Sequence, residues 1–277
     1  MTVGVLYVVA TPIGNMDDMV PRAVNVLQQV SVIAVEDTRH SGRLLQHFSI
    51  NTPLVAYHEH NEQAQAKNLV QRMLDGEEVA LISDAGTPLV SDPGYRLVKL
   101  AQENEVRVVP VPGACALIAA LSASGLPSDR FSFEGFLPAK VQQRKKILAG
   151  LSTESRSLIF YESPHRIVDS LADMVEAFGA ERLAVLAREI TKTFETIRQL
   201  PLAELHAWVV GDSNQQRGEI VVLIEGAREQ ANALSGEVIH LLTVLAEELP
   251  PNQAASLAAK ATGCKRKELY QWLIDHH

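Results

Sequence analysis

Four segments of the sequence combine carboxylates, glycines and prolines in a way that is typical of ligand-binding loops. The densest is 83–94 (SDAGTPLVSDPG), which holds two Asp, two Gly and two Pro. Its small residues let a backbone approach a ligand closely. Segment 110–116 (PVPGACA) opens an apolar helix, whose free N–H groups suit a polar or anionic ligand group. The other two segments are 10–15 (ATPIGN) and 36–39 (EDTR).

Each segment also has a simple structural interpretation. A proline–glycine pair makes a turn or begins a helix, and Asp37 or Thr38 suits the first position of a helix. Their location carries more weight, because each segment directly follows a predicted strand. Ligands of open parallel sheets bind at the carboxyl ends of strands.

The strands that position these segments are short Val- and Ile-rich runs bounded by Pro, Gly, Asn and Asp. They alternate with amphipathic stretches such as 21–30, 62–74 and 95–104. This βαβα pattern predicts a largely parallel sheet with helices on both faces. The expected strands are Val5–Ala10, Val32–Val35, Leu54–Tyr57, Val79–Ile82 and Val106–Val111, then Ser157–Tyr161, Leu183–Arg188, Thr193–Gln199 and Glu219–Glu225.

The predicted fold class is α/β, with two α/β domains and a small helical module at the C-terminus. A cluster of Gly and Pro at 124–140 separates the first domain, 1–123, from the second, 124–230. A linker is expected at 227–236, followed by a helical tail at 237–277.

The tail has the pattern of a helix-turn-helix. Helices are expected at 252–261 and 265–274, with a Thr-Gly-Cys turn between them. The second helix begins with Lys265, Arg266 and Lys267, which makes a nucleic-acid contact one interpretation and a small packing module the other.

Composition narrows the function classes. The formal net charge of −8 argues against a nonspecific nucleic-acid binder, which gains affinity by neutralising phosphates. No apolar run reaches the roughly 18 residues of a membrane span, and no signal peptide is expected. Cys115 and Cys264 lack metal-ligand spacing, which favours a reducing, cytoplasmic compartment without structural zinc. The pair His58 and His60 is too weak a pattern to predict a metal, so none is expected.

Taken in order, the motifs resemble the tetrapyrrole-methylase superfamily, in the branch that makes 2′-O-methylcytidine in the decoding region of small-subunit (16S) ribosomal RNA. The resemblance covers about 5–225. It implies S-adenosylmethionine as cofactor in a cleft between the two α/β domains, the small ribosomal subunit as partner, and a homodimer. The motifs are LYVVATPIGN (6–15), VEDTR (35–39), SDAGTPLVSDPG (83–94), VPGACA (111–116), FYESPHR (160–166), REITK (188–192) and GEI (218–220).

The chain also departs from its metabolite-methylating relatives. Those usually carry a Gly-x-Gly turn after the first strand, whereas this sequence has Pro12-Ile13-Gly14 there and no Gly-x-Gly anywhere. That disfavours a tetrapyrrole substrate and a glycine-rich Rossmann loop. Cys115 stands where serine is common and is interpreted as a small filler near the cofactor.

The resemblance also implies roles for individual residues. A ribose hydroxyl needs a positioned base or polarising cation, for which the unranked candidates are Asp37, Glu162, Glu189 and Lys192. Expected cofactor contacts are Pro12, Asp84, Gly86, Val90, Cys115, Ala116, Tyr161 and Gly218. Expected RNA contacts are Arg39, Arg188, His165, Lys265, Arg266 and Lys267.

Two other functions remain open at this point. The acidic charge favours a methyltransferase acting on a tetrapyrrole or another small metabolite. A non-enzymatic helix-turn-helix regulator would explain the tail but leaves the motifs of the first 230 residues without a role.

Overall fold

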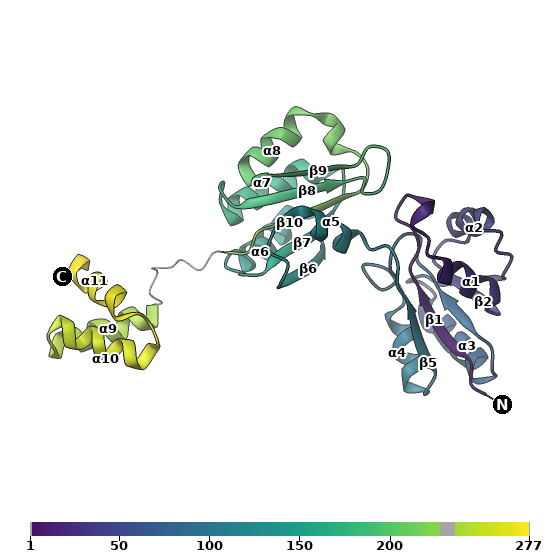
Figure 1. The fold of residues 1–277 in the computed structure, drawn as a ribbon, viewed down its shortest axis with the longest axis horizontal. Coiled ribbons are helices and arrows are strands. Elements are labelled where there is room, and N and C mark those ends of the chain that lie inside the picture. The colour runs from purple at the N-terminus through teal and green to yellow at the C-terminus, as the bar shows by residue number, and fades with distance from the viewer. Residues whose placement is uncertain (1, 228–235, 277) are drawn as a thin grey trace. The chain divides into compact units, whose positions relative to one another are not determined.

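The computed structural model describes residues 2–227 and 236–276. The chain divides into two compact units, 1–227 and 228–277. The first contains two sheets and the second contains helices (Figure 1). Apart from its two end residues, the linker predicted at 227–236 lies outside the described residues.

The first sheet is entirely parallel, as the alternation of strands and helices predicts, with strand order β3-β2-β4-β1-β5. It follows the predicted strands to within one residue at each end. Its strands are β1 (Val5–Val9), β2 (Val32–Val35), β3 (Leu54–Ala56), β4 (Val79–Leu81) and β5 (Arg107–Val111). The connecting helices are η1 (Met16–Asp18), α1 (Pro21–Gln29), α2 (Thr38–His47), α3 (Glu62–Leu74) and α4 (Tyr95–Glu103).

Successive residues of the central strands enter two different cores. In β2, Val32 and Ala34 pack with side chains of α3 and α4, whereas Ile33 and Val35 pack with those of α1 and α2. This alternation follows from the period-two geometry of a strand, and it explains why these strands are continuous apolar runs. Helices therefore cover both faces of the sheet (Figure 1).

The second sheet is mixed, with order β6-β7-β10-β8-β9. Only β6 and β7 are parallel, and β10 is antiparallel to both of its neighbours. Its strands are β6 (Phe131–Phe136), β7 (Ser157–Glu162), β8 (Leu183–Arg188), β9 (Thr196–Pro201) and β10 (Ile220–Ile224). The helices of this part are α5 (Ala116–Ser124), α6 (Val141–Gly150), α7 (Ile167–Phe178), α8 (Leu202–Gly211) and η2 (Ser213–Gln216).

Helix α5 follows β5 of the first sheet but packs on the second. Its Leu117 and Leu121 form a core with Ile159 and Val221, while α6, α7 and α8 cover the opposite face. The helix ends at Gly125, whose φ of +71° is the left-handed conformation that favours glycine. The residues that pack on the second sheet therefore begin with α5, before the boundary predicted between 123 and 124.

The second unit consists of α9 (Gly236–Glu248), α10 (Pro251–Thr262) and α11 (Arg266–His276). They share a small core that includes Leu242, Ala255 and Leu269. Helices α10 and α11 correspond to the predicted helix pair, while α9 adds a third helix. No helix among residues 2–227 and 236–276 is long and apolar enough to span a membrane.

Candidate active site

A cavity of about 420 Å³ lies at the carboxyl ends of β1, β4 and β5, and residues of the second sheet line its other side. This volume is in the range of small-molecule sites, about 300–1,000 Å³. The location is the one that parallel-sheet geometry predicts. The lining residues are Ile13, Ala85, Gly86, Thr87, Val90, Ser91, Asp92, Cys115, Ala116, Phe136, Tyr161, Glu162, Ser163, Pro164, Ile190, Gly218, Glu219, Ile220 and Val221.

Three loops of the first sheet are hydrogen-bonded to one another beneath the cavity. The backbones of Thr11 and Gly86 exchange two hydrogen bonds, with N···O distances of 2.8 and 3.0 Å. The Thr87 hydroxyl donates to the carbonyl of Ala114 at 3.0 Å. Gly86 has a φ of +83°, and a Cβ there would lie 3.2 Å from the side chain of Ile13. The loops after β1, β4 and β5 therefore hold one another in place.

Aromatic rings form the wall that the second sheet contributes. The ring centroid of Tyr161 lies 4.8 Å from that of Phe133 and 5.6 Å from that of Phe136. The backbone N–H of Leu117, in the first turn of α5, donates to the Tyr161 hydroxyl at 3.2 Å. Burial raises the pKa of Tyr161 to about 12, so the phenol stays neutral and can also donate a hydrogen bond.

Glu162 lines the cavity, but its carboxylate already accepts hydrogen bonds from neighbouring residues of the chain. Its side chain is buried and accepts hydrogen bonds from the backbone N–H of Ser163 at 2.6 Å and the Ser170 hydroxyl at 2.6 Å. It also forms an ion pair with Arg166 at 2.8 Å. A carboxylate with these three donors fixes the start of the segment that leads into α7.

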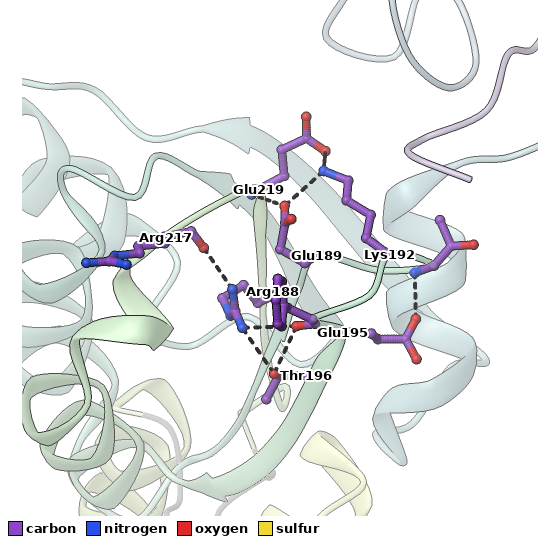
Figure 2. A network of polar contacts seen from close by, with 9 residues as sticks. Arg188, Glu189, Lys192, Glu195, Thr196, Arg217 and Glu219 are labelled. Atoms are coloured by element: carbon purple, nitrogen blue, oxygen red, sulfur yellow. Dashed lines mark hydrogen bonds and ion pairs between the residues drawn. The ribbon is translucent and has the colours of Figure 1, made fainter. Parts of the chain in front are cut away.

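Lys192 joins two carboxylates at the edge of the cavity. Figure 2 shows its ammonium group between Glu189, at 2.8 Å, and Glu219, at 3.0 Å. Partial burial opposes charge on Lys192, but these two hydrogen bonds outweigh it and raise its pKa. Burial likewise opposes charge on Glu189, and the bonds from Lys192 and the backbone of Glu219 lower its pKa. Both groups are therefore ionised at neutral pH.

Two glycines allow this arrangement. A Cβ at Gly14, where φ is +141°, would collide with the aliphatic chain of Lys192. A Cβ at Gly218, where φ is +77°, would collide with the carboxyl group of Glu189. The Thr191 hydroxyl, in the same loop as Lys192, donates a hydrogen bond to the carboxylate of Asp18 at 2.6 Å. This loop of the second sheet thus rests against the loop that follows β1.

Arg188, expected to contact RNA, lies inside the protein and is only 7% exposed. Its guanidinium donates to the side chain of Gln215 at 3.3 Å and to the carbonyls of Phe194 at 2.9 Å and Arg217 at 3.3 Å. Figure 2 shows the bond from Arg188 to Arg217. These bonds tie two loops together. The structure therefore corrects the expectation of an accessible phosphate contact at Arg188, because the guanidinium is buried among protein acceptors.

Asp37 and Arg39 lie outside the cavity lining. The Asp37 carboxylate caps α2 and accepts from the backbone N–H of Arg39 at 2.8 Å, which lowers the pKa of Asp37. The side chain of Arg39 is exposed. Asp84 accepts from the backbone N–H of Asp37 at 3.3 Å and so links the loops after β2 and β4. Asp84 therefore supports the loops rather than lining the cavity.

Asp92 lines the cavity and was missed by the sequence prediction. Burial, followed by the negative charge of Glu36, raises its pKa to about 6. The pKa of Glu36 is raised as well, first by burial and then by Asp84. The second Asp of the segment 83–94 (SDAGTPLVSDPG) was the available signal, but the sequence does not indicate which of the segment's two carboxylates enters the cavity.

Six of the eight residues predicted to contact the cofactor line the cavity, namely Gly86, Val90, Cys115, Ala116, Tyr161 and Gly218. Pro12 is buried beside the lining residue Ile13, and Asp84 lies behind the loop. Of the catalytic candidates Glu162 lines the cavity, Glu189 and Lys192 stand at its edge, and Asp37 stands apart. The sequence also missed the apolar lining from Ile190, Ile220 and Val221.

The remaining expected RNA contacts are exposed. His165 lies just after the cavity residues Ser163 and Pro164. Lys265, Arg266 and Lys267 are at the start of α11 in the second unit; Lys265 pairs with Glu268 and Arg266 donates to Asn252. Across 2–227 and 236–276 no group of three His, Cys, Asp or Glu could hold a metal ion.

Comparison with known proteins gives both units a counterpart. Residues 5–206 match the family described as Tetrapyrrole (Corrin/Porphyrin) Methylases, and residues 232–277 match the RsmI C-terminal HTH domain. The chain is 61% identical over 277 residues to Ribosomal RNA small subunit methyltransferase I of Pseudomonas aeruginosa, covering 99% of this chain and 98% of that protein. It is 54% identical over 273 residues to the Vibrio cholerae protein of that name, covering 98% and 95%.

Among solved structures, uroporphyrin-III-C-methyltransferase from Thermus thermophilus is similar with a TM-score of 0.57. The similarity covers 80% of this chain and 94% of that chain at 19% identity, and therefore concerns the fold alone.

Proposed function

Because this chain belongs to the tetrapyrrole (corrin/porphyrin) methylase family, we propose that it methylates ribosomal RNA of the small subunit, with S-adenosylmethionine as methyl donor. The observation that carries the proposal is identity of 61% with a ribosomal RNA small subunit methyltransferase over nearly the whole of both chains. That similarity includes the C-terminal helices, which a methylase of small metabolites does not need for chemistry.

The cavity suits this methyl donor by size and chemistry. Gly86 and Gly218 both line the cavity; a Cβ at Gly218 would collide with the Glu189 carboxyl group, and a Cβ at Gly86 would crowd Ile13 at 3.2 Å. Ile13, Val90 and Ile190 offer apolar surface, and the N-terminal turn of α5 begins at the lining residue Ala116. The N-terminus of α5 favours the carboxylate of the methyl donor, and the carboxylates that line the cavity favour the positive charge of its sulfonium group.

When bound, this donor supplies an activated methyl group and its leaving group, so the protein's role is alignment and proton transfer. The hydrogen-bonded loops after β1, β4 and β5 hold the donor side of the cavity in place. The apolar walls offer water few hydrogen-bond partners. Lys192, fixed by Glu189 and Glu219, holds its ammonium group at the cavity edge, where a remaining N–H can donate a hydrogen bond to a hydroxyl oxygen.

We further propose the 2′-hydroxyl of a cytidine ribose in the decoding region of 16S ribosomal RNA as the acceptor. This finer proposal is supported by the motifs of the cavity loops and by the absence of a Gly-x-Gly sequence. The exposed Lys265, Arg266 and Lys267 act as an RNA handle, with His165 and Arg39 as further contacts. Assembly as a homodimer and a cytoplasmic location remain predictions from the family.

Labelled methyl transfer tests the proposal directly. Purified small ribosomal subunits from a strain lacking the enzyme should accept label, and nuclease digestion followed by mass spectrometry should place it on 2′-O-methylcytidine. Uroporphyrinogen serves as the alternative acceptor. Label in the tetrapyrrole and none in the subunits would reject an RNA substrate.

A further inference from the structure

Phe136, at the end of β6, is an exposed aromatic side chain in the lining of the cavity. The apolar lining residues Ile13, Ile220 and Val221 are buried, whereas 55% of Phe136 is exposed. Single exposed apolar residues are ordinary on a protein surface and need no explanation there. This ring, however, stands in the wall of the proposed methylation site, with much of its surface open to solvent.

An irregularity in β6 turns this ring toward the cavity. The span from Phe133 to Phe136 is in register with the span from Ile159 to Tyr161 of β7, so three steps of β6 oppose two of β7. Gly135, within this bulge, has a φ of +67°, which favours glycine. Because successive residues of a strand point to opposite faces, the extra residue moves Phe136 to the face of Tyr161, on the cavity side. Without it, Phe136 would lie on the face that α6 and α7 cover.

The contact with Tyr161 holds the Phe136 ring but leaves a face of it open. The two ring centroids lie 5.6 Å apart and the ring planes are inclined by 64°. Such a T-shaped contact occupies at most one face of the Phe136 ring. Tyr161 is itself held by the backbone N–H of Leu117, at 3.2 Å from its hydroxyl oxygen. The Phe136 ring is therefore positioned in advance, and its open face can stack on another planar group.

The surroundings of this ring suit a nucleotide. Lys140 is exposed and stands four residues after Phe136, directly before α6. Proteins bind unpaired RNA with this combination, because cations contact the phosphates and aromatic rings stack on the bases. A ribose whose hydroxyl approaches a methyl donor inside the cavity leaves its base at the cavity wall, within reach of an exposed ring there.

We infer that Phe136 is the platform on which the base of the acceptor nucleotide stacks, an inference that rests on the proposed function. The contact makes and breaks no covalent bond. Stacking orders the unpaired nucleotide so that its ribose hydroxyl meets the methyl group, and Phe136 thus acts in positioning. Every base has a π face, so the ring supplies affinity and orientation, while recognition of cytosine falls to other groups.

The test compares the full-length wild-type protein with Phe136→Ala, Phe136→Leu and Phe136→Tyr in the methylation of small ribosomal subunits. Loss of one base–aromatic stack should lower kcat/KM of Phe136→Ala by about 5- to 150-fold. Phe136→Leu keeps an apolar side chain without a planar face and should lose nearly as much. Phe136→Tyr keeps the ring and should stay within about threefold of wild type.

Phe131→Ala is the matched control. Phe131 lies in the same strand and is also exposed, by 38%, but it is outside the cavity lining. Its kcat/KM should equal that of the wild type. Calorimetry should give S-adenosylmethionine affinities for Phe136→Ala and wild type that agree within about threefold, because the ring contacts the acceptor and not the donor.

Photo-cross-linking identifies what the ring touches. A benzoyl-phenylalanine at position 136, irradiated with small subunits and cofactor present, should cross-link to ribosomal RNA at or beside the methylated nucleotide, whereas the same group at position 131 should not. A cross-link to a second copy of the chain in place of RNA overturns the inference.

Three kinetic results also overturn it: a Phe136→Ala loss below about fivefold, a fully active Phe136→Leu, or a rate loss explained by lost cofactor binding. A wild-type protein that binds cofactor but does not methylate subunits instead overturns the proposed function, and this inference with it.

Discussion

Replacing Asp92 by Asn should stabilise the protein at neutral and alkaline pH, whatever reaction the cavity performs. The folded structure disfavours the ionised form of Asp92, because burial and Glu36 raise its pKa from 3.8 to about 6. A group whose pKa is raised on folding contributes stability below its unfolded pKa and loses that contribution as pH rises through the folded pKa. Asn cannot ionise, so the variant avoids this loss.

The pKa shift sets the size of the effect. A difference of about two units corresponds to about 3 kcal/mol at pH 8. Asp92 is only partly buried, and solvent screening reduces this to about 1–2 kcal/mol. For a domain of this size, that is an increase in melting temperature of about 2–8 °C. The difference should be near zero at pH 4 and develop between pH 4 and 7.

Thermal and denaturant unfolding of both proteins at half-unit pH steps from 4 to 8 measures this difference. Asp129→Asn, at an exposed position outside the cavity lining, serves as the control. An Asp92→Asn variant that is less stable than wild type at pH 8, or equally stable at every pH, would refute the assignment of a disfavoured charge.

Three further outcomes are expected. Gly14→Ala should lower turnover and destabilise the fold by about 1–2 kcal/mol, because Gly14 has a positive φ that strains alanine and because the new Cβ displaces the side chain of Lys192. Gly42→Ala, with open space around it, is the control in the same methylation and melting assays. Arg144→Met should cost up to about 3 kcal/mol in denaturant unfolding, because its buried partner Asp173 loses the ion pair at 2.7 Å and keeps only Lys145, at 3.7 Å, as counter-charge; an unchanged midpoint would contradict this. Alanine at all three basic positions of 265–267 should weaken subunit binding and reduce its logarithmic salt slope by up to about 3, with cofactor affinity unchanged in calorimetry.

The first sheet was predictable from sequence because its inner strands β2 and β4 are buried on both faces. Runs such as Val32–Val35 are entirely apolar, and Pro, Ser or acidic residues stand close to their ends, so composition alone marks their limits. Strand β6 was missed for the opposite reason. It alternates polar and aromatic residues, contains Gly135 at a register shift, and lies within a stretch of Gly and Pro that predicts a break. Its partner β7 decides its conformation, and that pairing is not local information.

The missed helices have a similar explanation. Helix α8 is almost wholly apolar and lacks a polar stripe, so it offers no clear period. Helix α6 carries three consecutive basic residues, and its buried Arg144 is stabilised by Asp173 of α7 rather than by its own neighbours. Tertiary contacts decide both segments.

At the site, residue type predicted which loops surround the cavity but not which side chains enter it. Leu89 and Ser91 adopt positive φ angles of 72° and 65°. Left-handed conformations are uncommon for non-glycine residues, so no sequence rule predicts them at these positions. They set the course of the loop between Asp84, which supports it from behind, and Asp92, which enters the cavity.

The last strand of the second sheet has a consequence for biosynthesis. Strand β10 is the last strand among residues 2–227 and 236–276 but lies between β7 and β8, so it supplies the hydrogen bonds that both of them need. A nascent chain that stops before residue 220 therefore exposes the unpaired edges of two half-sheets, while the apolar face of α5 has no Val221 to pack on. Open strand edges promote association between chains. A ribosome that stalls late in this message would release an aggregation-prone product, whereas one that stalls after 227 would release a chain with both sheets complete.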